Sequence, residues 1–231
     1  MPAYRSSSEA EIRDAVVARI RERRPDARII HEINVSSHGP NRMDLIAVDR
    51  AEIIAVEIKS AKDKLDRLEA QVKAMRGCAH HVVAAIHEKF MVERVTNDMA
   101  AHYQRGGEFY RRDIPEDIRW GQATVWVFPE IWRSMASKQE GGYDFDATWR
   151  FPEKIIQTPA PAGAIDLLWR DELYELCGQL RVSATRRSTM PEMVSSLRWH
   201  CNGKELTLGI CRALRARACT EADAPMYEAA A

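Results

Sequence analysis

Three ionisable residues, Asp44, Glu57 and Lys59, stand in two short apolar runs of the sequence, "MDLIAV" and "EIIAVEIK". Burying a charged group costs free energy unless the group is paired or binds a metal ion. Two neighbouring carboxylates suit a hard cation such as Mg²⁺ or Mn²⁺, which prefers oxygen ligands. A lysine beside them could hold or polarise a water molecule. Together these groups have the chemistry needed for metal-assisted hydrolysis of a phosphodiester.

The two runs predict an antiparallel hairpin that brings the three residues together. If the turn falls at Arg50-Ala51, the numbers of paired residues sum to 101, and Asp44 lies opposite Glu57. Because side chains alternate along a strand, Lys59 points to the same face as both carboxylates. Arg-Ala is not a favoured tight-turn sequence, so a longer turn is also compatible. A buried salt bridge between Lys59 and one acid explains the same residues, and the sequence leaves both interpretations open.

The other hairpin residues are apolar on both faces, which predicts strands in the middle of a covered sheet. Leu45, Ala47, Ile54, Val56 and Ile58 share one face, and Ile46, Val48, Ile53 and Ala55 share the other. Periodicity predicts helices over 8–24, 61–76 and near 91–104, and strands over 27–35, 43–48, 52–59, 81–86 and 123–128. We expect Ser8 to cap the first helix, with Glu11 three positions on, and Ser60 with Asp63 to cap the second.

The second half of the chain has a different composition. Residues 134–163 contain "SKQEGGYDFD" and "TPAPAG", which are typical of a connector. Further on, "AIDLLWRDELYELC" predicts an amphipathic helix, Thr189 and Glu192 begin a second helix in capping-box register, and a third follows near 205–217. We therefore predict an α/β domain over 1–133, a linker over 134–163 and a small helical module over 164–231.

The overall charge is balanced, with 34 basic and 34 acidic side chains, but the distribution is uneven. Residues 181–218 contain eight Lys or Arg against two Glu. Such a basic module points to nucleic acid, although arginines on solvated helix faces explain it equally well. The five cysteines form no CxxC pair and no membrane-spanning run is present. We expect reduced thiols, no membrane partner and a cytoplasmic protein.

The segments "RMDLIAV", "AVEIKSAKDKLDRLEAQ" and, more weakly, "DIPEDIRWG" resemble the PD-(D/E)xK nuclease superfamily, in particular its MmcB-like and VRR-nuclease-like group. The resemblance covers roughly residues 9–130. It implies a restriction-endonuclease-like α/β core of helix, three strands, helix and strand with a mixed central sheet. The family places proline before its aspartate, whereas this chain has Met43. By position, the resemblance implies Asp44, Glu57 and the carbonyl of Ile58 as metal ligands, with Lys59 acting on water or phosphate.

Members of the family often add a polar residue from the helix after the lysine, and Gln71 matches it; a surface glutamine is the alternative. Many members also use a glutamate from the first helix. Glu11 matches best by its "EIR" context, while Glu9 aligns better with the apolar face, and either could simply be a favourable acid in a first helical turn. Glu32 in "HEINV" is a further candidate, with an exposed strand residue as its alternative.

The segment "LYELCGQLRVSATRRSTMPEMVSSL" faintly resembles a SAP-type DNA-binding module. Arg186 and Arg187 come just before a predicted helix N-terminus, where they could bind a phosphate. A plain helical docking module is the alternative.

These features predict a Mg²⁺- or Mn²⁺-dependent DNA nuclease with little sequence specificity, in DNA repair or in phage or defence DNA processing. Double-stranded or branched DNA is the expected partner, and a homodimer is possible. A catalytically silent DNA-binding or scaffold protein and an RNA-directed nuclease are the alternatives.

Overall fold

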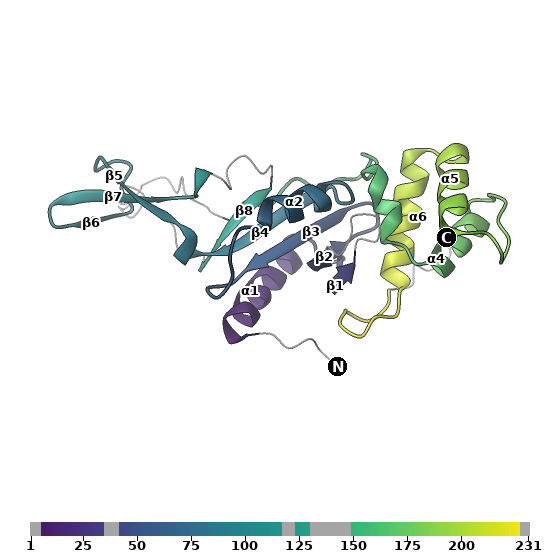
Figure 1. Ribbon diagram of the computed structural model, residues 1–231, viewed down its shortest axis with the longest axis horizontal. Helices are drawn as coiled ribbons and strands as arrows, with labels where there is room; N and C mark the ends of the chain where they lie inside the picture. Colours follow the sequence, from purple (N-terminus) through teal and green to yellow (C-terminus); the bar gives the residue numbers. More distant parts are fainter. Residues whose placement is uncertain (1–5, 35–41, 117–122, 130–148, 227–231) are drawn as a thin grey trace.

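The computed structural model describes residues 6–34, 42–116, 123–129 and 149–226 and shows a mixed α/β fold (Figure 1). Its centre is a five-stranded mixed sheet with the strand order β1-β2-β3-β4-β8. The first three strands are antiparallel neighbours, and β4 and β8 are added in parallel. The strands are β1 (Arg28–Asn34), β2 (Arg42–Val48), β3 (Ile53–Lys59), β4 (His81–His87) and β8 (Thr124–Phe128). The predicted fold class is confirmed at this level.

The hairpin formed by β2 and β3 has the predicted register. Leu45 pairs with Val56 and Val48 pairs with Ile53, so the numbers of paired residues sum to 101. The connection is the tight Arg50-Ala51 turn, closed by a 2.9 Å backbone hydrogen bond between the residues that flank it. The assumed turn position therefore assigned the residues to the correct faces.

Both faces of the sheet are covered by helices. Helix α1 (Ser7–Arg23) lies on one face, and α2 (Leu68–Arg76) lies on the other (Figure 1). The predicted inward residues divide between two core clusters as expected. The α1-side cluster includes Leu45, Ala47, Ile54, Val56, Ile58, Ile12, Val16 and Ile20. The α2-side cluster includes Ile46, Val48, Ile53, Ala55, Leu68, Val72 and Met75.

The C-terminal helices extend the α2-side cluster instead of forming a separate core. They are α4 (Arg170–Gln179), α5 (Met190–His200) and α6 (Gly203–Ala216), preceded by the short helix η4 (Ala162–Leu167). Leu173, Leu197 and Leu214 belong to the same buried cluster as the sheet. The predicted capping box of α5 is present. We call α4, α5 and α6 the helical module.

The described part of the expected connector, residues 149–163, packs on the sheet. Trp149 stacks on Trp126 of β8, with ring centroids 5.0 Å apart, and its indole N–H donates to Val127 O. Glu52 accepts a hydrogen bond from the Ile155 N–H. This segment is therefore part of the folded body.

The predicted helix near 91–104 is wrong. That region belongs to a three-stranded antiparallel sheet of β5 (Val92–Thr96), β7 (Glu108–Asp113) and β6 (Tyr103–Arg105), in that spatial order. The β-branched residues of "VERVT" favour a strand, and Gly106 and Gly107, at φ values of 59° and 85°, make the turn. We call β5, β6 and β7 the arm, because they project from the end of the central sheet (Figure 1).

Two predicted helix starts also differ from the structure. Helix α1 is capped by Ser6, not Ser8. Helix α2 begins at Leu68 instead of residue 61, because Asp63 accepts hydrogen bonds from the N–H and hydroxyl of Ser60 at 2.7 Å and makes a local turn. Lys89 also donates to the carbonyl oxygens of the same loop. Downstream, the single helix expected over 164–177 is divided between η4 and α4.

All five cysteines are free, as expected for reduced thiols. In the described ranges, no helix is long and apolar enough to cross a membrane.

Candidate active site

The end of β3 brings three of the predicted residues into direct contact. Lys59 Nζ donates to Glu57 Oε1 at 2.7 Å and to Gln71 Oε1 at 2.8 Å. The amide nitrogen of Gln71 donates to the same Glu57 oxygen. Glu57 and Lys59 are both buried although both side chains are ionisable. Because Gln71 comes from α2, which covers this face of the sheet, the prediction that this helix supplies a polar group to the cluster agrees with the geometry.

Asp44 reaches the same place from β2. The ladder between β2 and β3 ends at the Leu45–Val56 pair. Beyond it, Asp44 Oδ2 accepts a 2.7 Å hydrogen bond from the Ile58 N–H. The carboxylate thus lies across from the end of β3, next to the main chain of the residue predicted as the third ligand.

Burial raises the pKa of both carboxylates. Burial raises the pKa of Glu57, and the negative charge of Asp44 raises it further, to about 7, although Lys59 and Gln71 act in the opposite direction. The pKa of Asp44 is also raised, chiefly by burial, with a smaller contribution from Glu32. Ionising both acids is therefore unfavourable unless another positive charge is added.

One observation indicates that the carboxylate oxygens of this cluster suit a hard cation. Glu57 Oε1 accepts from both Lys59 and Gln71, whereas Glu57 Oε2 is buried with no hydrogen-bond partner among the described residues. A buried carboxylate oxygen without a partner is costly and suits Mg²⁺ or Mn²⁺. The Lys59–Glu57 salt bridge considered as an alternative is present, but it leaves this oxygen unexplained.

The ligand set is small. The described part of the chain contains no group of three or more His, Cys, Asp or Glu side chains that could hold a metal ion. The predicted set has two such side chains, Asp44 and Glu57, and completes its protein ligands with the main-chain carbonyl of Ile58. Water would have to fill the other positions, as is usual for Mg²⁺.

The structure distinguishes between the two glutamates of the first helix. Glu11 is exposed. The next residue, Ile12, points into the core, so the two side chains lie on different sides of α1. Glu9 is half-buried and forms a 2.8 Å ion pair with Arg13. Arg13 in turn donates to the carbonyl oxygen of Asp44. The structure therefore connects Glu9, and not Glu11, to the acid cluster, which corrects the choice made on sequence context.

Glu32 also lies beside Asp44. Its Oε1 is 3.2 Å from Arg13 Nη2, and its Oε2 is 2.6 Å from Arg42 Nε. Sequence reasoning did not identify Arg13. A signal was available, because Arg13 lies one turn after Glu9 in the helix and next to the apolar stripe, where an arginine is rarely buried without a partner.

Arg186 and Arg187 are not brought to this cluster. They are exposed in the loop that precedes α5. The helical module packs at the turn end of the hairpin, where Arg215 Nη1 approaches Asp49 Oδ1 at 3.5 Å. The acid cluster lies at the opposite end of β3, and a strand of seven residues spans roughly 20 Å.

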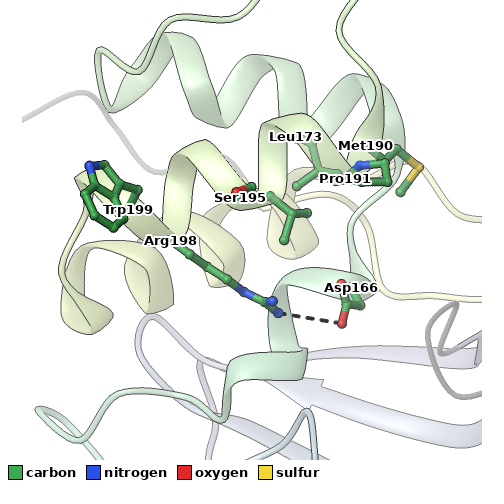
Figure 2. Close-up of a pocket in the computed structure, with 8 residues that line it drawn as sticks. Asp166, Leu173, Met190, Pro191, Ser195, Arg198 and Trp199 are labelled. Atoms are coloured by element: carbon green, nitrogen blue, oxygen red, sulfur yellow. Dashed lines mark ion pairs between the residues drawn. The ribbon is translucent and has the colours of Figure 1, made fainter.

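A cavity of about 590 Å³ lies between η4, α4 and α5. Figure 2 shows Trp199, Arg198 and Ser195 along α5, with Arg198 directed toward Asp166 of η4. The acid cluster contributes no residue to the lining of this cavity. The cavity is therefore a different feature from the candidate active site.

The family model described as Bacteriophage P4 protein cII matches residues 3–101. This segment contains Asp44, Glu57, Lys59 and Gln71, and it ends before the arm is complete. No curated protein and no solved structure matched the chain.

Proposed function

We propose that this protein is a metal-dependent DNA nuclease with little sequence specificity. The observation that carries the proposal is the convergence of Asp44, Glu57, Lys59 and Gln71 at one end of β3, with an unpartnered buried oxygen on Glu57. The order of helix, three strands, helix and strand around these residues agrees with the PD-(D/E)xK resemblance. A buried pair of acids whose pKa values are both raised, beside a lysine, is typical of a catalytic site.

Each residue has a distinct role in this proposal. Asp44 and Glu57, with the Ile58 carbonyl oxygen, would hold Mg²⁺ or Mn²⁺. When bound, the ion would supply a Lewis acid for the phosphodiester and a positive charge for the water. Lys59 would orient the attacking water or stabilise the charge that develops on phosphate. Gln71 holds Lys59 Nζ in place through its Oε1. Water adds across the P–O bond, and the 3′-bridging oxygen leaves.

The helical module would add phosphate contacts through Arg186 and Arg187. DNA rises about 3.4 Å per base pair, so a duplex of about six base pairs spans the roughly 20 Å of β3 between the site and the module. Because phosphate contacts carry no sequence information, the expected specificity is low. The match to a bacteriophage P4 protein family favours a phage DNA-processing role over general repair.

The decisive test is cleavage of labelled linear, flapped and single-stranded DNA and of RNA, in Mg²⁺, in Mn²⁺ and in EDTA. We expect DNA cleavage that EDTA abolishes. Lys59→Ala should lower the rate by about 100-fold or more, the usual cost of removing a group that stabilises transition-state charge. Lys73→Ala is the matched control, because Lys73 is exposed on α2, and it should cleave like the wild type.

One observation favours a second candidate, a catalytically silent scaffold that retains the fold. The Lys59–Glu57 ion pair closes part of the cluster without any other group. DNA binding without cleavage in every metal would support the scaffold and refute the nuclease proposal. Cleavage of RNA alone would assign the same chemistry to a different substrate.

A further inference from the structure

One face of α5 lines the cavity between η4, α4 and α5. The lining residues of this helix follow one another at spacings of three and four positions, so they share one side of it. They are Pro191, Val194, Ser195, Arg198 and Trp199. On the other side of α5, Met193 and Leu197 are buried in the core. The helix is therefore held to the protein by one face, and the opposite face borders the cavity.

Trp199 exposes a large aromatic ring at this cavity. Its side chain is 85% exposed, more than any other large hydrophobic side chain in the described ranges. The other tryptophans with described side chains differ. Trp126 and Trp149 are buried, and the guanidinium of Arg217 lies over the ring of Trp169 at 4.4 Å. Because an aromatic ring in water gains free energy when another flat group stacks on it, Trp199 is suited to a stacked ligand.

Arg198 gives the cavity a positive charge (Figure 2). Its Nη2 donates to Ala162 O at 2.8 Å and lies 3.9 Å from Asp166 Oδ2. Among the described residues both contacts are made by Nη2. A guanidinium has five N–H donors, and the side chain is 45% exposed. Nη1 and Nε can therefore donate to a ligand while Nη2 keeps its contacts with η4.

Arg198 also borders a second, smaller cavity. This cavity has a volume of about 280 Å³, and Pro161, Gly203 and Leu206 are among its lining residues. Arg198 belongs to the lining of both cavities. The surface thus has the order of hollow, cation and hollow. A single nucleic-acid strand presents the matching order of base, phosphate and base, and proteins bind such strands with aromatic rings and cations.

Exposed cations continue at both ends of α5. Arg186 and Arg187 come before the helix, and Lys204 follows Gly203 in the first turn of α6. The nearby carboxylates of Glu192 and Glu205 are held in place as helix caps. Each accepts a hydrogen bond from the backbone N–H of the N-cap residue of its own helix, at 2.7 and 2.9 Å respectively. This distribution of charge complements a row of phosphates better than the apolar surface of a protein partner.

We propose that the cavity binds an unpaired strand of DNA, with one base stacked on Trp199 and the adjacent phosphate bound by Arg198. This inference rests on the proposed nuclease function and deepens it, because it assigns substrates that have a single-stranded part, such as flapped DNA. Stacking tolerates every base, which agrees with the low sequence specificity expected of the enzyme.

The test is equilibrium binding to the full chain in EDTA, where cleavage does not interfere, measured by fluorescence anisotropy. The probes are a labelled oligothymidylate of about 16 nucleotides and a duplex of the same length. Trp199→Ala should weaken single-strand binding by about 5- to 100-fold, the effect of losing one stacked base, and leave duplex binding unchanged. Leu208→Ala is the matched control, because Leu208 is an exposed apolar residue of α6 that lines neither cavity, and it should bind like the wild type.

Two further variants report on the ring and on the charge separately. Trp199→Phe keeps an aromatic ring, so it should retain most of the single-strand affinity but lose the quenching of tryptophan fluorescence that the bound strand causes in the wild type. Arg198→Gln should reduce the slope of log affinity against log salt for the single strand by about 0.7, the value for one phosphate contact.

Equal single-strand binding by the wild type and a folded Trp199→Ala variant would overturn the inference, and so would an equal loss on single strand and duplex. Dimers of the wild type that Trp199→Ala does not form, with oligothymidylate binding unchanged, would assign the face to a second copy of the chain and also overturn it. If circular dichroism shows that Trp199→Ala does not fold, an unchanged salt slope in Arg198→Gln refutes the inference. Single-strand binding that depends on Trp199, without cleavage in any metal, would support this site and refute the nuclease, whereas cleavage with binding independent of Trp199 would do the reverse.

Discussion

Replacing Glu57 with glutamine should stabilise the metal-free protein at alkaline pH, because the site holds its acids in an unfavourable state. Glu57 Oε1 accepts from Lys59 and Gln71, and a glutamine carbonyl can accept the same two bonds. The other oxygen, Oε2, has no hydrogen-bond partner in the described structure. An amide NH₂ placed there would be neutral and could donate toward Asp44. The substitution therefore removes the repulsion between the two carboxylates and keeps the hydrogen bonds from Lys59 and Gln71.

The size of the effect follows from the pKa. Burial and the nearby Asp44 charge raise the pKa of Glu57 from 4.5 to about 7. Between these two values the folded chain keeps a proton that the unfolded chain has lost, so stability falls as the pH rises. Above about pH 7 the ionised Glu57 lowers the free energy of unfolding by the full amount. A shift of roughly 2.5 pH units corresponds to about 3 kcal/mol. For a chain of this size, that is a rise in Tm of roughly 6–12 °C.

Thermal unfolding in EDTA at pH 5 and at pH 8 measures the effect. Glu57→Gln should exceed the wild type in Tm at pH 8, and the two should converge near pH 5. Glu69→Gln, an exposed substitution on α2, should follow the wild type at both values. A Glu57→Gln variant that is less stable than the wild type at pH 8 would show that Glu57 is a net stabilising ion-pair partner, and the reasoning about an unneutralised acid pair would be refuted.

Glu52 should behave in the opposite way: burial alone would raise its pKa, but His81, Arg24 and a backbone N–H lower it to about 2. It therefore contributes roughly 3 kcal/mol of stability above pH 4.5 that is lost as the pH falls toward 2. Urea titrations of Glu52→Gln should show a smaller loss of stability across this range than the wild type, and an equal loss would contradict this assignment. Replacing both Arg186 and Arg187 with alanine should weaken DNA binding and reduce the slope of log affinity against log salt by about 2, whereas an unchanged slope would exclude their contact with phosphate.

The hairpin was predictable because its pattern is local and redundant. The charged break between the two apolar runs leaves room for a short turn, and the position of that turn determines which residues pair across the hairpin. That constraint fixed the register and brought Asp44, Glu57 and Lys59 to the same end of the hairpin. Gln71 followed from the family resemblance, which implies a polar residue on the helix after the lysine.

The features that could not be predicted depend on distant partners. Arg13 finds Glu32 and Asp44 at separations of 19 and 31 positions, and no periodic pattern connects them. The turn before α2 is made locally by Ser60 and Asp63, but it also accepts hydrogen bonds from Lys89, which lies 28 and 26 positions away from the loop carbonyls. In the arm, the alternation in "VERVT" is too short to exclude a helix on sequence grounds. The described part of the predicted linker is packed on the sheet, because Trp149 stacks on Trp126 of β8. The sequence does not show that these two tryptophans meet.

The free side of β1 is closed by residues from the far end of the chain. The His31 N–H donates to Glu221 O, and the Asp223 N–H donates to Ile29 O. Arg28, wholly buried, holds the carbonyl oxygen of Asp223 across 195 positions. During synthesis, β1 therefore leaves the ribosome with unpaired amides long before its cover exists. An uncovered strand edge is a template for wrong pairing, so the nascent protein passes through a stage in which self-association competes with completion of the fold.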